Sequence, residues 1–142
     1  MKIKQLTDND YVVLLKKGDN LITALTNFHN QVDNKFCKIN AIGAVTDISL
    51  GYAYLEDNEI KYNNIEYKEE YELLSLDGNM SLRDNKTAIH LHASLSDKNN
   101  NCIGGHVNYA TISIVCEMFI TVYNTKISRE FDKEVGIAVL DI

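Results

Sequence analysis

The residues of this chain best suited to chemistry are three histidines that lie close together in the sequence. His90 and His92 are separated by one leucine, and His106 follows two glycines. Successive side chains of an extended strand point to opposite faces, so His90 and His92 would share one face of a strand. A third imidazole that returns after a turn would complete a set of three ligands. Three protein ligands with an open fourth position are the usual arrangement of a catalytic zinc site.

The alternative is that these histidines are half-buried polar side chains whose nitrogens are satisfied by neighbouring groups. For a single His-x-His pair that would be the better interpretation. The third histidine favours a metal, because Gly104 and Gly105 before it allow the backbone to approach another segment closely. The fourth histidine, His29, is expected at the edge of the apolar face of a helix and not among the ligands.

Glu117 is a further candidate for a catalytic role. It lies between Val115 and Phe119 on one face of an apolar segment, where a carboxylate is costly unless it is paired or bound to a cation. It could be a fourth metal ligand, a base, or a partner for Arg83 or Arg129. A glutamate on the solvent-facing side of an antiparallel sheet is an equally good interpretation.

Other polar side chains could also join such a site. Glu70 and Glu72 share one face of an expected strand, and the same two interpretations apply to them. Cys102 lies four residues before the third histidine and could compete as a soft ligand, although packing is its simpler role. Arg129 and Asp132 predict a local ion pair or a contact between subunits.

A strand over Thr87–Leu95 would position the first two histidines. Its apolar residues Ile89 and Leu91 fall on the face opposite the two imidazoles. The polar segment Asp97–Asn101 predicts a loop, after which the third histidine can return toward the first two.

The other elements predict one helix and a large sheet. Leu21, Leu25 and Phe28 recur at the spacing of an amphipathic helix. Asp19 or Asn20 would be its N-cap. The segments that favour strands are Tyr11–Lys16, Lys38–Ala44, Thr46–Leu55, Glu59–Tyr67, Glu70–Leu76, Met80–Arg83 and Thr111–Tyr123. Turns are expected at Asp57-Asn58, at Asp77-Gly78-Asn79, which indicates a hairpin, and at Asp84-Asn85-Lys86. These elements predict an α+β fold with a mixed, mainly antiparallel sheet.

The composition excludes several classes of protein. The chain has 142 residues, of which 45% are hydrophobic, enough for the core of one domain over residues 1–142. It has no apolar run long enough to cross a bilayer and no apolar signal core, so we expect a cytoplasmic protein without membrane contacts. Its three cysteines match no zinc-finger spacing, and reduced thiols are expected.

The charge argues against direct binding to nucleic acid. Fourteen basic and 20 acidic residues give a net charge of −6, and the lysines are scattered. Affinity for DNA without sequence preference comes from neutralising phosphates, so direct binding is expected to be weak or absent. No Ser-His-Asp triad can be recognised by spacing, and Gly104-Gly105 lacks the lysine of a phosphate-binding loop.

Several motifs, taken in order, resemble the plants and prokaryotes conserved (PPC) domain family. They are Gly18-Asp19, Ala41-Ile42-Gly43-Ala44, Leu50-Gly51-Tyr52, Tyr71–Asn79, Ile89–Asp97, Gly104-Gly105-His106 and Arg129-Glu130-Phe131-Asp132. The resemblance covers nearly the whole chain. It implies a barrel-like sheet with one main helix, assembled as a homotrimer.

The resemblance also bears on function. In plants the domain accompanies AT-hook motifs in nuclear DNA-binding proteins, whereas free-standing bacterial members are described as candidate DNA-binding proteins without a settled activity. This chain has no proline and therefore no AT-hook. The histidines are also similar to the zinc-binding histidines of acetolactate decarboxylase, which implies that His90, His92 and His106 are zinc ligands. Decarboxylation itself is not predicted, because a shared fold does not carry a reaction.

Two hypotheses follow. The first is a homotrimeric protein of this family with a three-histidine site for zinc or a similar divalent metal, which binds or acts on a small molecule. The second is a regulator whose trimer docks onto a protein partner, with structural histidines. The sequence leaves open whether the protein is an enzyme, and whether Glu117, Glu70, Glu72 or Cys102 joins the site.

Overall fold

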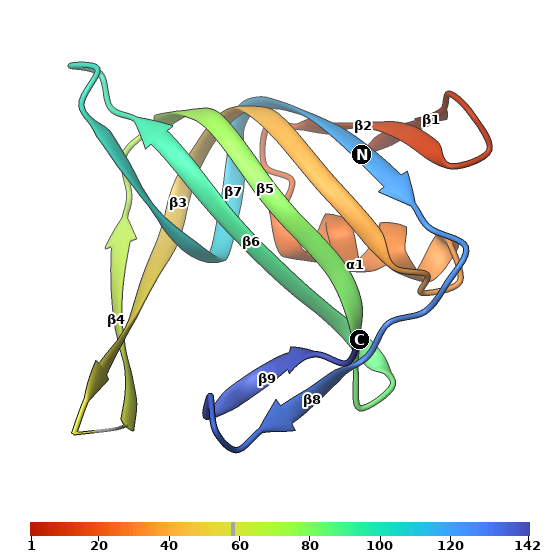
Figure 1. The fold of residues 1–142 in the computed structure, drawn as a ribbon. Coiled ribbons are helices and arrows are strands. Elements are labelled where there is room, and N and C mark those ends of the chain that lie inside the picture. The colour runs from red at the N-terminus through yellow and green to blue at the C-terminus, as the bar shows by residue number, and fades with distance from the viewer. Residues whose placement is uncertain (58) are drawn as a thin grey trace.

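The protein is built on one antiparallel sheet of seven strands, in the order β1-β2-β7-β6-β5-β3-β4, with a small separate hairpin near the C-terminus (Figure 1). A computed structural model describes residues 1–57 and 59–142, so Asn58 of the expected Asp57-Asn58 turn lies outside the described residues. The elements are β1 Lys2–Gln5, β2 Asp10–Lys16, α1 Leu21–Gln31, β3 Cys37–Glu56, β4 Glu59–Tyr67, β5 Tyr71–Arg83, β6 Lys86–Ser96, β7 Cys102–Val122, β8 Arg129–Asp132 and β9 Ile137–Leu140.

A second pairing turns part of this sheet into a ring. Strand β3 pairs with β5 on one side and with β7 on the other, so β7, β6, β5 and β3 form a closed circuit of hydrogen-bonded neighbours. Strands β1, β2 and β4 extend the sheet outside the ring. The α+β class and the single compact domain are confirmed, and where the resemblance implies a barrel-like sheet, the sheet is ring-like in part.

The helix forms as its sequence pattern predicts. The Asn20 side chain accepts a hydrogen bond from the backbone N–H of Thr23 at 2.9 Å, which satisfies one of the free donors at the helix start. Leu21, Leu25 and Phe28 are buried in the core, where α1 packs against β6 and β7. Within the described part of the chain, no helix has the length and apolar character needed to cross a membrane.

The hairpin expected at Asp77-Gly78-Asn79 is wrong. These residues lie inside β5, which continues from Tyr71 to Arg83. Gly78 is opposite Leu91 of β6, and a Cβ atom at Gly78 would lie 1.9 Å from the carbonyl oxygen of His90. The glycine therefore serves a close approach between two strands, and not a turn.

Other strand boundaries also differ from the expectation. Lys38–Ala44 and Thr46–Leu55 are parts of one strand, β3, and Thr111–Tyr123 corresponds to the second half of β7. A shift in the β3–β7 register between Gly43 and Val45 leaves extra residues on β7. Ile114 is consequently exposed, although it alternates along the strand with the buried Ile112 and Cys116. Strand β1 was not expected at all.

Candidate metal centre

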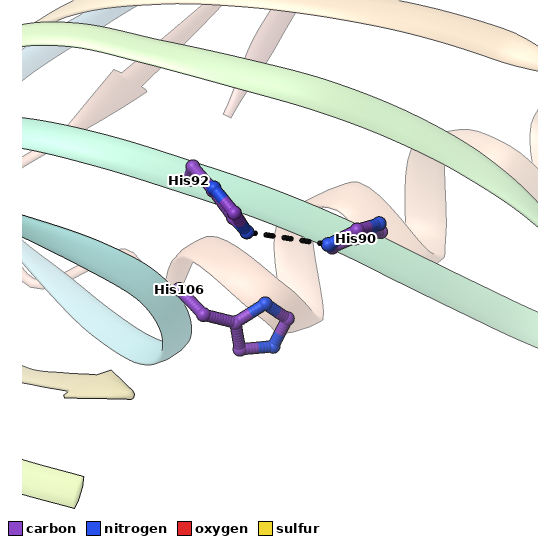
Figure 2. Close-up of side chains that lie close together, drawn as sticks. All are labelled: His90, His92 and His106. Atoms are coloured by element: carbon purple, nitrogen blue, oxygen red, sulfur yellow. Dashed lines mark hydrogen bonds between the residues drawn. The ribbon is translucent and has the colours of Figure 1, made fainter. Parts of the chain in front are cut away.

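The three histidines come from one hairpin of the ring. His90 and His92 lie on β6, and His92 is directly opposite His106 on β7. Figure 2 shows the three imidazoles facing one another in front of these two strands. Glycine is needed before His106, since a Cβ at Gly105 would lie 2.8 Å from the carbonyl oxygen of Gly51 on β3. The strand with its histidine can therefore press close to β3.

The distances between the ring nitrogens fit a small cation. The Nε2 atoms of His90 and His92 are 3.3 Å apart, and one ligand nitrogen from each of the three histidines lies within 4.8 Å of the others. Zinc bound tetrahedrally with Zn–N bonds of about 2.0–2.1 Å separates its ligand nitrogens by about 3.3 Å. The His90–His92 pair has this spacing, and a nitrogen of His106 lies within 4.8 Å of both.

Two of the three imidazoles, those of His90 and His106, have lowered pKa values. Burial, followed by the charges of Arg129 and of the two other histidines, lowers the pKa of His90 to about 4. Burial also lowers the pKa of His106, with contributions from His92 and Arg129. A metal ligand must be an unprotonated nitrogen, and the lowered pKa values of His90 and His106 favour that state at neutral pH.

Arg129, which the sequence suggested only as a partner of Glu117 or Asp132, lies beside the histidines. It lies at the start of β8, and its Nη2 donates to Asn79 Oδ1 at 3.0 Å and to His90 Nδ1 at 3.4 Å. Its other nitrogens donate to Ser81 Oγ and to the carbonyl of Ala138. The ion pair expected between Arg129 and Asp132 is not formed. Asp132 instead accepts from the backbone N–H groups of the following turn.

The carboxylates and the cysteine considered from the sequence lie away from this cluster. Glu117 is exposed farther along β7, opposite Leu14 and Ile42. Glu72 is exposed opposite Ala44 at the other end of β5, and Glu70 precedes that strand. Cys102 is exposed and pairs with Ser96. The structure therefore brings the three histidines together without them.

A cavity of about 750 Å³ opens beside the histidines. One wall is the β3–β4 arm, formed by residues 51–56 of β3 and 59–64 of β4, which contributes Tyr62 and Ile60. The opposite wall is the β8–β9 hairpin, which contributes Ile137 and Ala138. In Figure 1 both hairpins extend from the same end of the ring. The floor holds the histidines, with Arg129 and Arg83 beside them. A small molecule in this cavity would reach the three imidazoles.

His29 lies outside this site, on α1. Its exposed fraction is 0%, so it is buried with the apolar face of the helix and not, as the sequence predicted, at the edge of that face. Its Nε2 donates to the carbonyl oxygen of Lys35 at 2.8 Å, and its Nδ1 lies 2.9 Å from the hydroxyl of Thr87. Because the carbonyl can only accept, Nδ1 accepts from the hydroxyl. Both nitrogens of His29 therefore have hydrogen-bond partners within the fold, and neither is free to bind a metal.

Comparison with known proteins places this geometry in context. The chain is 30% identical to a plant- and prokaryote-conserved (PPC) protein from Pyrococcus horikoshii, with a TM-score of 0.83 over 99% of this chain and 94% of the other. It is 29% identical to a metal-containing protein from Archaeoglobus fulgidus, with a TM-score of 0.85 over all of both chains. It is 28% identical over 102 residues to AT-hook motif nuclear-localized protein 13 of Arabidopsis thaliana. That match covers 69% of this chain and 23% of the plant protein.

A more distant likeness concerns the fold alone. Acetolactate decarboxylase from Bacillus subtilis subspecies spizizenii superposes with a TM-score of 0.54 and 15% identity, over 94% of this chain and 62% of the enzyme. The family model of the Plants and Prokaryotes Conserved (PCC) domain matches residues 4–124. With that match and a fold shared along nearly its whole length with a PPC protein, the chain belongs to the PCC domain family.

Proposed function

We propose that residues 1–142 act as one cytoplasmic domain that assembles as a homotrimer and holds zinc, or a similar divalent ion, through His90, His92 and His106. The metal would bind or act on a small molecule in the adjoining cavity. The observation that carries the proposal is the 3.3 Å spacing of the His90 and His92 Nε2 atoms, with His106 completing a cluster of three imidazoles.

The residues around the cluster support a working site and not a closed structural one. Three protein ligands leave a coordination position free, which zinc uses as a Lewis acid or to activate water. The cavity beside the histidines supplies room for a ligand at that position. The metal-containing relative from Archaeoglobus fulgidus adds support by its description.

The trimer is supported by apolar side chains on the outside of the ring. Ile42 of β3 and Phe119 of β7 are 53% and 51% exposed on neighbouring strands. Ile114 and Leu74 are also exposed. Burying such side chains between subunits is favourable, since each large apolar side chain gains about 1.5–3 kcal/mol when it is fully removed from water. Light scattering on the eluting protein should give three times the 16.1 kDa mass of the chain. A monomer at micromolar concentration would contradict the assembly.

A protein-interaction module is the second candidate function. The AT-hook protein from Arabidopsis thaliana carries a related domain within a much longer chain. With a net charge of −6 per chain, direct binding to DNA should be weak, so a regulatory role would act through a protein partner. Titration of a labelled duplex at moderate salt tests this expectation. Submicromolar, salt-sensitive binding would place the regulatory function first.

Metal analysis decides between the two candidates. Protein purified without a histidine tag or chelators should carry up to one zinc or similar ion per chain. His90→Ala and His92→Ala should each remove it, whereas His29→Gln should not, because His29 lies outside the cluster. Metal retained in both alanine variants would rule out the three-histidine site. A wild-type protein without metal, also after incubation with excess zinc, would favour the interaction module.

A further inference from the structure

The cavity beside the histidines differs in charge from the rest of the chain. The chain has 20 acidic and 14 basic residues. Among the described residues that line the cavity, however, there are two arginines, Arg83 and Arg129, and no aspartate or glutamate. A cleft lined by charge of one sign concentrates its electrostatic potential. This cavity therefore attracts anions, although the protein as a whole is acidic.

Arg129 lacks an anionic partner in the described part of the chain. Its guanidinium is partly buried, and its bonds reach the neutral atoms Ser81 Oγ, Asn79 Oδ1, the Ala138 carbonyl oxygen and His90 Nδ1. A partly buried cation with neutral partners is costly, and an oxyanion bound by the planar guanidinium offsets that cost. The position of Arg129 beside the cavity suggests that a ligand supplies this anion.

The bond between Arg129 and His90 competes with metal binding at His90. Arg129 can only donate, so Nδ1 of His90 accepts, and a neutral His90 then carries its proton on Nε2. That proton points toward His92 Nε2, the place where a metal would bind. If His90 ligates a metal through Nε2, its remaining proton must move to Nδ1. Two donors would then face each other over 3.4 Å, so the Arg129–His90 bond and the metal exclude each other.

We propose that Arg129 is the anion-binding residue of this site and that metal binding releases it from His90 into the cavity. Its ligand is the oxyanion of a small organic acid, a carboxylate or a phosphate. The apolar part of that acid lies between Tyr62 and Ile60 of the β3–β4 arm and Ile137 of the β8–β9 hairpin. The proposal rests on the proposed metal site and adds the class of molecule that the site takes.

The first test measures anion binding by calorimetry with zinc-loaded protein. The probes are phenylacetate and phenyl phosphate, with phenylacetamide as a neutral control of similar shape. We expect at least one anion to bind about 10-fold more tightly than the amide, as one charge-assisted contact allows. Arg129→Gln should lose that advantage while it keeps its zinc, and Arg129→Lys should retain part of it. The difference between phenylacetate and phenyl phosphate identifies the preferred oxyanion.

Lys133→Gln is the matched control, because it removes the same charge from the exposed turn of the same hairpin. It should bind the anions as the wild type does. Equal anion binding by Arg129→Gln and the wild type, or no preference for anions over the amide, would overturn the proposal. Circular dichroism of each variant shows whether it is folded, and Arg129→Lys provides the test if Arg129→Gln is not.

The second test measures zinc affinity in buffer without organic anions. Because the Arg129–His90 bond must break before the metal binds, Arg129→Gln should bind zinc a few-fold more tightly than the wild type. A weaker affinity would show that Arg129 supports the metal site and would overturn the release step. A wild-type protein that binds no zinc would instead refute the proposed function itself, and this outcome is visible before any anion is added.

Discussion

His29 on α1 and the three histidines on the β6–β7 hairpin place the same side chain in two different environments. His29 has no exposed surface, and its two nitrogens have a carbonyl and a hydroxyl as partners. The nitrogens of the hairpin histidines face one another and a cavity, with Arg129 as the added donor. One environment is complete within the fold, whereas in the other the ring nitrogens of three histidines converge on one place.

The difference teaches which property identifies a functional histidine. Burial lowers the pKa of His29, and it also lowers the pKa of His90 and His106. A perturbed pKa is therefore common to both environments and does not separate them. The partners of the ring nitrogens do separate them, because His29 bonds to a carbonyl and a hydroxyl, whereas three ring nitrogens that converge can turn their lone pairs to a cation.

The largest effect expected from this comparison is on zinc affinity. His92→Ala should weaken zinc binding by more than about 100-fold, since even the loss of an outer partner of a ligand commonly costs about 10–100-fold. His29→Gln should leave the affinity unchanged. Competition against a chromogenic chelator measures both variants. A similar loss in both would mean that the two environments are not separate.

The next effect concerns the strand that carries His90 and His92. Gly78→Ala should lower the free energy of unfolding by about 3 kcal/mol or more, because the added Cβ would meet the backbone of β6 and overpacking of this kind is poorly relieved. Gly18→Ala is the control, since no atom lies within 4 Å of a Cβ there. Gly18→Ala should lower the free energy of unfolding by only about 1 kcal/mol, which is the cost of placing alanine in the left-handed backbone at this position. Urea unfolding of the metal-free proteins compares the two, and equal losses would contradict the close approach of β5 and β6.

His29 should matter for stability where His92 does not. His29→Ala leaves the Lys35 carbonyl without its donor and opens a cavity, so it should lower the free energy of unfolding by about 2–3 kcal/mol. His92→Ala removes an exposed side chain and should change the stability of metal-free protein by about 0.5 kcal/mol or less. The same unfolding experiment measures both. A large loss in metal-free His92→Ala would make the hairpin histidines structural.

The smallest expected effect is the dependence of stability on pH. The folded-state pKa of His29 is below its usual value of 6.5, so the unfolded chain binds the proton more tightly. The stability of metal-free protein should therefore be complete above pH 6.5 and fall as the pH is lowered from there. His29→Gln should show a shallower fall, because its amide does not titrate. Urea midpoints between pH 7.5 and 5.5 measure the slope, and an identical slope in the variant would contradict this role.

Local patterns in the sequence were enough to predict much of the fold. The bounds of β4 match the prediction, Asn20 caps the helix, and a strand carries His90 and His92. The prediction of a hairpin at Gly78 was wrong because a glycine between polar residues is typical of a turn, but also occurs in a strand where a paired strand comes close. The need for glycine at position 78 comes from the nearby carbonyl of His90, and this contact can be seen only in the folded structure.

The candidate site was predictable from local sequence patterns in part. Its three histidines lie on neighbouring strands, so spacing along the chain could indicate that they meet. Arg129 comes from β8, and it reaches His90 only because β8 lies beside β5. No periodicity relates these two positions. The acidic residues that the sequence offered as further ligands lie elsewhere. A carboxylate on the outer face of a strand, such as that of Glu117, can be hydrated and needs no metal.

The pairing of β3 with β7 also has a consequence for how the molecule folds. Cys37 is opposite Val122 in that pairing, so closing the ring joins distant parts of the chain, a slow step because of its entropy cost. The three histidines instead share one hairpin that closes through the short loop at Asp97–Asn101. A metal held by that hairpin can be bound before the ring closes. Zinc bound at that stage should speed folding as well as slow unfolding.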